Sequence, residues 1–188
     1  MDAKEFNQQY ENVLARPLVK CGFQAQGQSL FCVKDKAVLA LLRLSLKSSG
    51  FLRETHFVVC VRHSFLRTLE KVPPKRFLTE PNEYPFKFRV SELSQEMHRG
   101  WRYSPCNLGH WNYDTIRFGD LTDATPPLDD IRYRITSYGI AWMDRLTPAE
   151  ALNQLKRNGE EAYCEKIWME DYEAFLSQAS VNSMMPTQ

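Results

Sequence analysis

Alternation of apolar side chains between residues 37 and 63 limits the fold more than any other feature of this sequence. In the first of two stretches, one set of alternate residues is entirely apolar: Val38, Ala40, Leu42, Leu44 and Leu46. Because successive side chains of a strand point to opposite faces, this set predicts a strand with one face in the core. The second stretch, THFVVCVRH over residues 55–63, alternates in the same way. The residues SSGFLRE between the two predict a hairpin loop.

A third strand is predicted over residues 30–33, because this short apolar run precedes the turn-like residues Lys34-Asp35-Lys36. Three consecutive strands of this kind form an antiparallel meander, which needs a helix to cover its apolar face.

Apolar residues at intervals of three and four predict such helices at both ends of the chain. The first helix would bury Phe6, Tyr10, Val13, Leu14 and Leu18, and would end near Cys21-Gly22. A later helix carries the stripe Ile131, Ile135, Tyr138 and Trp142, with Thr125 expected as its cap. Thr147 and Glu150 form the pattern of a capping box for the next helix, and Pro148 is expected at its first helical position. A final helix is predicted over residues 161–179.

These elements together predict an α+β fold. We expect an antiparallel sheet of about four to six strands with an N-terminal covering helix and a C-terminal helical group. Residues 1–180 are expected to form one domain, and residues 181–188 a mobile tail.

Composition narrows the class of protein. The 188 residues carry a net charge of only +1, which argues against a nucleic-acid partner. The N-terminal residues do not resemble a secretory signal, and no apolar stretch is long enough to span a bilayer, so no membrane partner is expected. Five scattered cysteines, an odd number, are typical of reduced thiols in a cytoplasmic protein.

The segment from Lys71 to Tyr113 is expected to leave the regular pattern. Four prolines between residues 71 and 85 exclude a central strand and predict a long surface excursion. A short strand is predicted at FKFRV (residues 86–90) and a clearer one at HWNYDTIRFG (residues 110–119).

Residues 98–111, HRGWRYSPCNLGHW, contain the residue types of several kinds of site. His98, Cys106 and His110, followed by Asp114, are possible metal ligands, but their spacing matches no established zinc pattern, so we expect no metal and no cofactor. Cys106 would serve as a nucleophile only with a nearby base and a lowered thiol pKa. A small hydrolase-like enzyme built on Cys106 and a histidine of the same loop is the alternative function.

Other polar groups have simpler interpretations. His56 and His63 are expected to be structural residues of a strand. Asp120, Asp123, Asp129 and Asp130 lie before or within the first turn of a helix, where they favour the helix dipole. Cations interleave with an aromatic residue in the set Lys75, Arg76, Lys87, Arg89, Arg99, Arg102 and Tyr103, as in some nucleic-acid-binding surfaces. The near-neutral total charge argues against that role, so no nucleic-acid partner is expected.

The order of elements resembles the bacterial domain-of-unknown-function family 4304. The matching positions are Gly22-Phe23, Phe31, the strand residues 42–46 and 57–61, and Trp142 with the helix after Thr147. This resemblance implies a small cytoplasmic α+β protein of a kind often found among immunity proteins, which neutralise a toxin delivered by a neighbouring cell.

Protein recognition accounts for most of the unusual composition of the middle segment. Tryptophan, tyrosine and arginine supply much of the binding energy of interfaces. The residues expected to contact a partner protein are Trp101, Arg102, Tyr103, His110, Trp111, Tyr113, Tyr84 and Phe86. The competing interpretation is that about half of these aromatic residues fill a core beneath the excursion. We therefore predict a non-enzymatic protein that binds another protein, most specifically a toxin that it neutralises.

Overall fold

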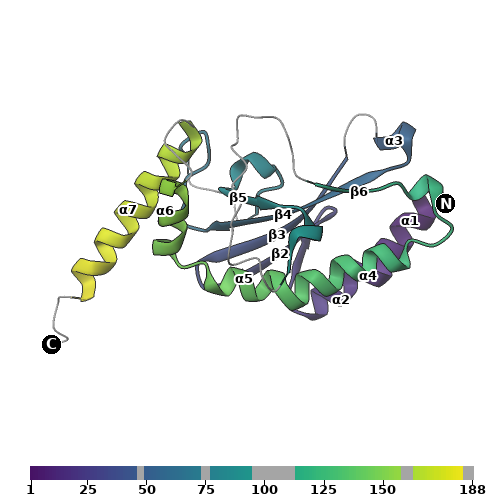
Figure 1. The fold of residues 1–188 in the computed structure, drawn as a ribbon, viewed down its shortest axis with the longest axis horizontal. Helices are drawn as coiled ribbons and strands as arrows, with labels where there is room; N and C mark the ends of the chain where they lie inside the picture. The colour runs from purple at the N-terminus through teal and green to yellow at the C-terminus, as the bar shows by residue number, and fades with distance from the viewer. Residues whose placement is uncertain (46–48, 73–76, 95–112, 158–162, 184–188) are drawn as a thin grey trace.

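Six strands form one antiparallel sheet in the computed structural model, which describes residues 1–45, 49–72, 77–94, 113–157 and 163–183 (Figure 1). The strands are β1 (Gln24–Gln26), β2 (Ser29–Lys34), β3 (Ala37–Leu44), β4 (Thr55–His63), β5 (Phe86–Phe88) and β6 (Asp114–Ile116). The order β1-β2-β3-β4-β5 keeps chain neighbours side by side, and β6 also pairs with β4. The sheet and the helices confirm the predicted α+β fold.

The longest pairing joins β3 and β4, from Ala37 opposite His63 to Leu44 opposite His56. The other edge of β4 is shared by two short strands. β5 pairs with residues 59–61 of β4, and β6 with residues 55–57. The start of β4 therefore lies between the end of β3 and β6, next to the hairpin loop.

Two long helical segments cover one face of the sheet (Figure 1). The N-terminal one runs through α1 (Ala3–Gln9), a π-helical turn (Tyr10–Ala15) and α2 (Arg16–Lys20). The second runs through α4 (Thr125–Arg134), another π-helical turn (Ile135–Gly139) and α5 (Ile140–Arg145). Buried residues of both segments, Leu14, Leu18, Ile131 and Ile135 among them, pack with the sheet residues Leu39, Leu41, Phe57, Val59 and Val61.

The prediction that β3 has one face in the core was wrong, because both faces are buried. The set that includes Val38, Ala40 and Leu42 packs into a second, smaller cluster with Phe31, Val58, Cys60 and Tyr84. The larger core lies beneath the opposite set, which includes Leu39 and Leu41. A central strand that is covered on both faces is apolar on both, and β3 accordingly contains the continuous apolar run AVLALL. In such a run the alternation of side chains cannot show which face the helices cover.

Some of the predicted helix caps are present in the structure. Gly22 has a φ of 98° just after α2, as expected for a glycine that closes a helix. Thr147 accepts a bond from the backbone nitrogen of Glu150 (3.2 Å) at the start of α6 (Pro148–Arg157). The Glu150 carboxylate instead accepts from Gln154 (2.8 Å). Thr125 is not a cap: α4 begins at this residue, and its backbone nitrogen donates to Asp123.

Other boundaries also differ from the predictions. β1 was not predicted, and β6 covers only part of the strand expected over residues 110–119, of which residues 110–112 lie outside the described residues. The hairpin loop contains a single helical turn, α3 (Ser49–Leu52). The last helix, α7 (Tyr163–Ser183), includes residues 181–183 of the expected tail. No helix in the described part of the chain is long and apolar enough to cross a membrane.

Buried side chains attach α7 to the end of β4. Trp168 and Tyr172 are fully buried, and the Tyr172 hydroxyl lies 2.8 Å from Nδ1 of His63. Arg67 binds Asp171 through its side chain (2.6 Å) and its backbone nitrogen (2.7 Å). Beyond these contacts, residues 177–180 of α7 are exposed, and Figure 1 shows the helix extending away from the sheet.

His63 should make the stability of the fold depend on pH. Burial lowers its pKa to about 4, so the folded protein holds a neutral ring that bonds to Tyr172 and to the backbone of Leu146. An unfolded histidine titrates near its ordinary pKa of 6.5. Between these values the unfolded chain binds more protons, and the free energy of unfolding should fall with falling pH by up to about 1.4 kcal/mol per unit.

Urea unfolding of wild type and His63→Gln from pH 7 to pH 4.5 measures this effect. Above pH 6.5 the difference in stability should be constant, and below it the difference should shrink as the wild type loses its advantage. Parallel curves over the whole range would show that His63 does not cause the acid sensitivity.

Candidate functional site

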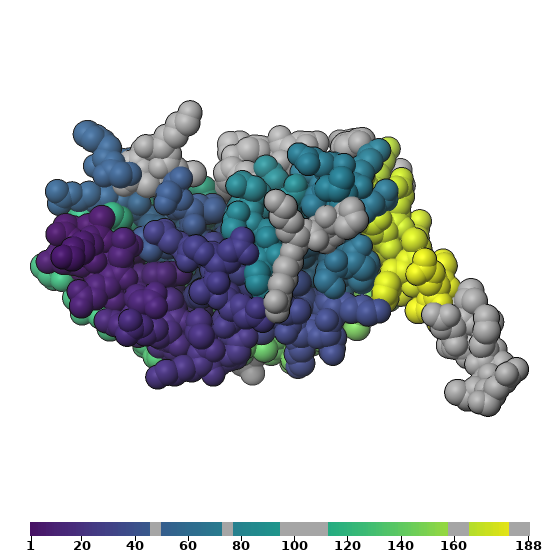
Figure 2. Space-filling model, turned by 180° about the vertical axis from the view of Figure 1, so that it is seen from behind, coloured from purple at the N-terminus to yellow at the C-terminus, as the bar shows by residue number. Residues whose placement is uncertain are grey.

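The hairpin between β3 and β4 ends in an exposed apolar tip, formed by Gly50, Phe51, Leu52 and Arg53. Phe51 is 92% exposed and Leu52 is 49% exposed, although both are large apolar side chains. Figure 2 shows this part of the chain projecting from the body, at the upper left of the view. The described residues include other exposed apolar side chains, but none is as exposed as Phe51.

Contacts with the turn after β6 hold the tip in place. The backbone nitrogen of Gly119, in a 3-10 turn (Phe118–Asp120), donates to the carbonyl of Arg53 (3.0 Å). Arg53 has a φ of 49°, a conformation in which a residue other than glycine is uncommon. A Cβ added to Gly119 would lie 2.8 Å from the Cβ of Arg53, so only glycine allows this close approach. The tip is therefore fixed to the sheet through β6 and this turn.

Polar side chains are buried beneath the tip, at the start of β4. His56 is 3% exposed and Glu54 8% exposed. Nδ1 of His56 lies 2.9 Å from the hydroxyl of Thr115 on β6, and the ring packs edge-on against Tyr113 at 4.6 Å. Burial lowers the pKa of His56, and the opposing effect of Glu54 is smaller. The neutral ring therefore links β4 to β6 below the tip.

Glu54 and Arg117 form an ion pair at the edge of this polar layer. Nε of Arg117 is 3.6 Å from one carboxylate oxygen of Glu54, and the other oxygen is 3.6 Å from Nε2 of His56. The Arg117 side chain remains 71% exposed, whereas that of Glu54 is buried. The carboxylate thus holds a positive charge at the surface beside the tip.

The opposite face of the hairpin end is fastened by Arg43. Its guanidinium donates to Thr55 (3.1 Å) and to Asn7 of α1 (2.7 Å), and it stacks over the rings of Tyr10 (4.6 Å) and Phe6 (5.0 Å). Contacts on both faces of the sheet therefore hold the base of the tip.

Thr115, His56 and Glu54 have the residue types of a hydrolytic triad, but their geometry is that of a structural contact. A triad needs a carboxylate hydrogen-bonded to the ring so that the histidine keeps its orientation. Here 3.6 Å separates the carboxylate from Nε2, which makes no hydrogen bond to any described residue. The pairing of β4 with β6 explains better why these three side chains lie together.

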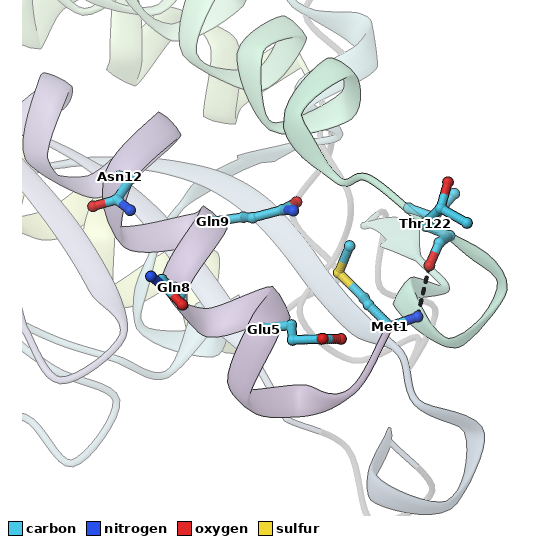
Figure 3. Close-up of a pocket in the computed structure, with 7 residues that line it drawn as sticks. Met1, Glu5, Gln8, Gln9, Asn12 and Thr122 are labelled. Carbon is cyan, nitrogen blue, oxygen red and sulfur yellow. Dashed lines mark hydrogen bonds between the residues drawn. The ribbon is translucent and has the colours of Figure 1, made fainter.

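A hollow of about 560 Å³ lies on the far side of the same turn (Figure 3). It lies between α1 and the chain after the turn, and it is lined by Met1, Glu5, Gln8, Gln9, Asn12, Leu121 and Thr122. Gln9 accepts a bond from the backbone nitrogen of Ala124 (2.7 Å), and the Met1 nitrogen donates to Leu121 (2.6 Å). Apart from Met1 and Leu121, the lining residues of the hollow have amide, carboxylate or hydroxyl side chains.

Most of the predicted partner-binding residues lie outside the described residues: Trp101, Arg102, Tyr103, His110 and Trp111. Tyr113 is half-buried against His56 and leads into β6. The predictions for Tyr84 and Phe86 were wrong, because their side chains are 0% and 1% exposed and belong to the two cores. The hydroxyl of Tyr84 is also bound, donating to the carbonyl of Leu78 (2.7 Å).

Most of the candidate metal-binding and nucleic-acid-binding residues also lie outside the described residues. His98, Cys106, His110, Lys75, Arg76, Arg99 and Arg102 lie outside the described residues. Asp114 accepts bonds from the backbone and hydroxyl of Ser91, and the described residues include no group of three or more histidine, cysteine, aspartate or glutamate side chains that could hold a metal ion. Lys87 is 4% exposed and cannot reach a phosphate backbone, whereas Arg89 is exposed.

The smaller polar sets have structural roles. Asp123 accepts from the backbone at the start of α4, while Asp129 and Asp130 pair with Arg132 and Arg134 along the helix. His63, as expected, is a structural residue of β4. Cys21, Cys32 and Cys60 are free thiols, and burial raises the pKa of Cys60.

The fold defines the chain as an α+β protein whose antiparallel sheet is covered by two helical segments and extended by a projecting hairpin. No family model matches the chain, and neither a curated protein nor a solved structure matches it.

Proposed function

We propose that this protein acts by binding another protein directly, and that the tip carries the contact. The observation that supports this most strongly is Phe51, which is 92% exposed two residues before Arg53, whose carbonyl accepts from Gly119. Burying such a side chain against a partner contributes about 1.5–3 kcal/mol. The bond at Arg53 restricts the backbone at the end of the tip, which reduces the conformational entropy lost on binding.

The predicted recognition segment, Lys71 to Tyr113, returns to the sheet directly beneath the tip. Tyr113 packs against His56, and β6 then pairs with residues 55–57. A partner seated on the tip would therefore lie close to the end of this segment. Phe51 and Tyr113 are the described residues of the proposed recognition surface, and Trp101 and Trp111 stay predicted contacts outside the described residues.

We also propose that the bound protein is a toxin, which this protein neutralises. This part of the proposal is based on the resemblance to the bacterial family 4304. A neutralising protein needs no chemistry of its own, since it can block an active site by steric cover and charge complementarity. An apolar anchor such as Phe51 would slow dissociation.

A photo-crosslinking amino acid at position 51 tests the binding proposal in cells that produce the protein. The matched control has the same residue at position 133, where a tyrosine on α4 is 55% exposed. We expect one protein to be crosslinked from position 51 in clear excess over position 133. Equal capture from the two positions would contradict a specific contact at the tip.

Growth then tests the toxin proposal separately. The captured protein, expressed alone, should arrest growth, and co-expression of the wild-type protein should restore it. A captured protein without any effect on growth would contradict neutralisation and leave direct binding in place.

A further inference from the structure

Two arginines border the apolar tip, and they suggest the chemistry of the partner. Arg53 follows Leu52 directly, and Arg117 is held beside the tip by Glu54. Resting on the proposed function, we infer that the tip binds an acidic protein surface, in which an apolar centre receives Phe51 and carboxylates meet the two guanidinium groups.

Arg117 presents its positive charge at the surface. Its side chain is 71% exposed although its Nε lies 3.6 Å from a carboxylate oxygen of Glu54. Because Glu54 is buried, the guanidinium is held at the surface without an exposed acidic group in this pair. An arginine held in this way loses less freedom when a second carboxylate binds to it.

Arg53 is restricted by its backbone and by the turn. Its φ of 49° and the bond from Gly119 fix the main chain, and the first atoms of its side chain pass close to Gly119. The side chain is exposed, so its charge is presented at the surface beside this turn. Arginine is enriched at interfaces because its planar group binds carboxylates through two parallel hydrogen bonds.

Two carboxylates oppose this positive charge: Glu54, which is buried and paired with Arg117, and Asp120. Asp120 follows Gly119 in the same turn and is exposed. Of these four groups only the two arginines and Asp120 are exposed, so the charge that they present at the surface favours an acidic partner. Asp120 provides a test in the opposite direction. Removing its carboxylate should strengthen binding of an acidic partner, whereas removing either arginine should weaken it.

A library of random dodecapeptides displayed on phage serves as the probe, with the whole protein immobilised. We expect the enriched peptides to combine large apolar residues with aspartate or glutamate. A synthetic copy of the most enriched peptide should bind about tenfold more weakly to Arg53→Asn and to Arg117→Gln, and about twofold more tightly to Asp120→Asn. Arg132→Gln, a change of the same charge on α4, should bind like the wild type.

The outcomes separate this inference from the proposed function. Peptides that require Phe51 but carry no acidic bias, or that ignore both arginine substitutions, would overturn the inference and leave tip binding intact. Failure to enrich any peptide would also count against it. Peptides that bind a Phe51→Asp variant as well as the wild type would contradict the tip as the binding surface.

Discussion

Replacing Arg62 with methionine should lower the free energy of unfolding by about 3 kcal/mol. Arg62 lies on β4 and is only 3% exposed. Its guanidinium donates to three backbone carbonyls, those of Glu83 (3.0 Å), His63 (3.4 Å) and Leu66. Methionine keeps most of the apolar contact but leaves the carbonyls of Glu83 and Leu66 without this donor, at a cost of about 1 kcal/mol or more each, whereas the carbonyl of His63 still accepts from the backbone nitrogen of Leu66.

Urea unfolding followed by circular dichroism measures this loss. Arg16→Met is the control, because Arg16 is 67% exposed and pairs only loosely with Glu11 (3.4 Å). We expect the control to stay within about 0.5 kcal/mol of the wild type, as for other surface changes. A variant at position 62 as stable as this control would show that the turns after β4 do not depend on the buried guanidinium.

Replacing Phe51 with aspartate should weaken binding of the captured partner by about 3 kcal/mol, or roughly 150-fold. The substitution removes the apolar anchor and places a negative charge where we expect the partner to be acidic. Stability should hardly change, since a side chain that is 92% exposed contributes little to the core.

Titration calorimetry with the purified partner measures the affinity, and thermal unfolding checks the fold. Tyr133→Asp is the matched control on α4 and should bind normally. A tip variant that binds with wild-type affinity would remove Phe51 from the interface. A variant that loses both binding and stability would show that Phe51 supports the fold instead.

Periodicity predicted the main elements because their packing depends on local patterns. The stripe from Phe6 to Leu18 forms the buried face of the N-terminal helix, and the alternation in residues 55–63 forms β4. The same patterns could not identify the helix-covered face of β3, because that choice depends on which segments cover each side. Residues 77–84 supply the second cover through long-range contacts that no local pattern shows.

The candidate site was harder to predict than the fold. Aromatic content directed attention to residues 71–113, yet Tyr84 and Phe86 are core residues. Composition cannot separate an aromatic anchor from a packed ring, since both follow from the same large apolar side chain. The tip was predicted only as a hairpin loop. Its signal was the pair Phe51-Leu52 in a loop that is otherwise polar and glycine-containing.

The polar layer beneath the tip depends on contacts between distant strands. His56 meets Thr115 only because β4 pairs with β6, and Arg53 meets Gly119 for the same reason. These pairings join residues about sixty positions apart in the chain. The sequence alone carries no sign of such proximity.

Hydrogen exchange of the protein with and without its captured partner tests the binding surface most directly. We predict that the partner slows exchange of backbone amides at residues 50–54 and 114–120, while α4 and the exposed end of α7 are unchanged. Protection confined to α4 or α7, with no change at the tip, would contradict the account.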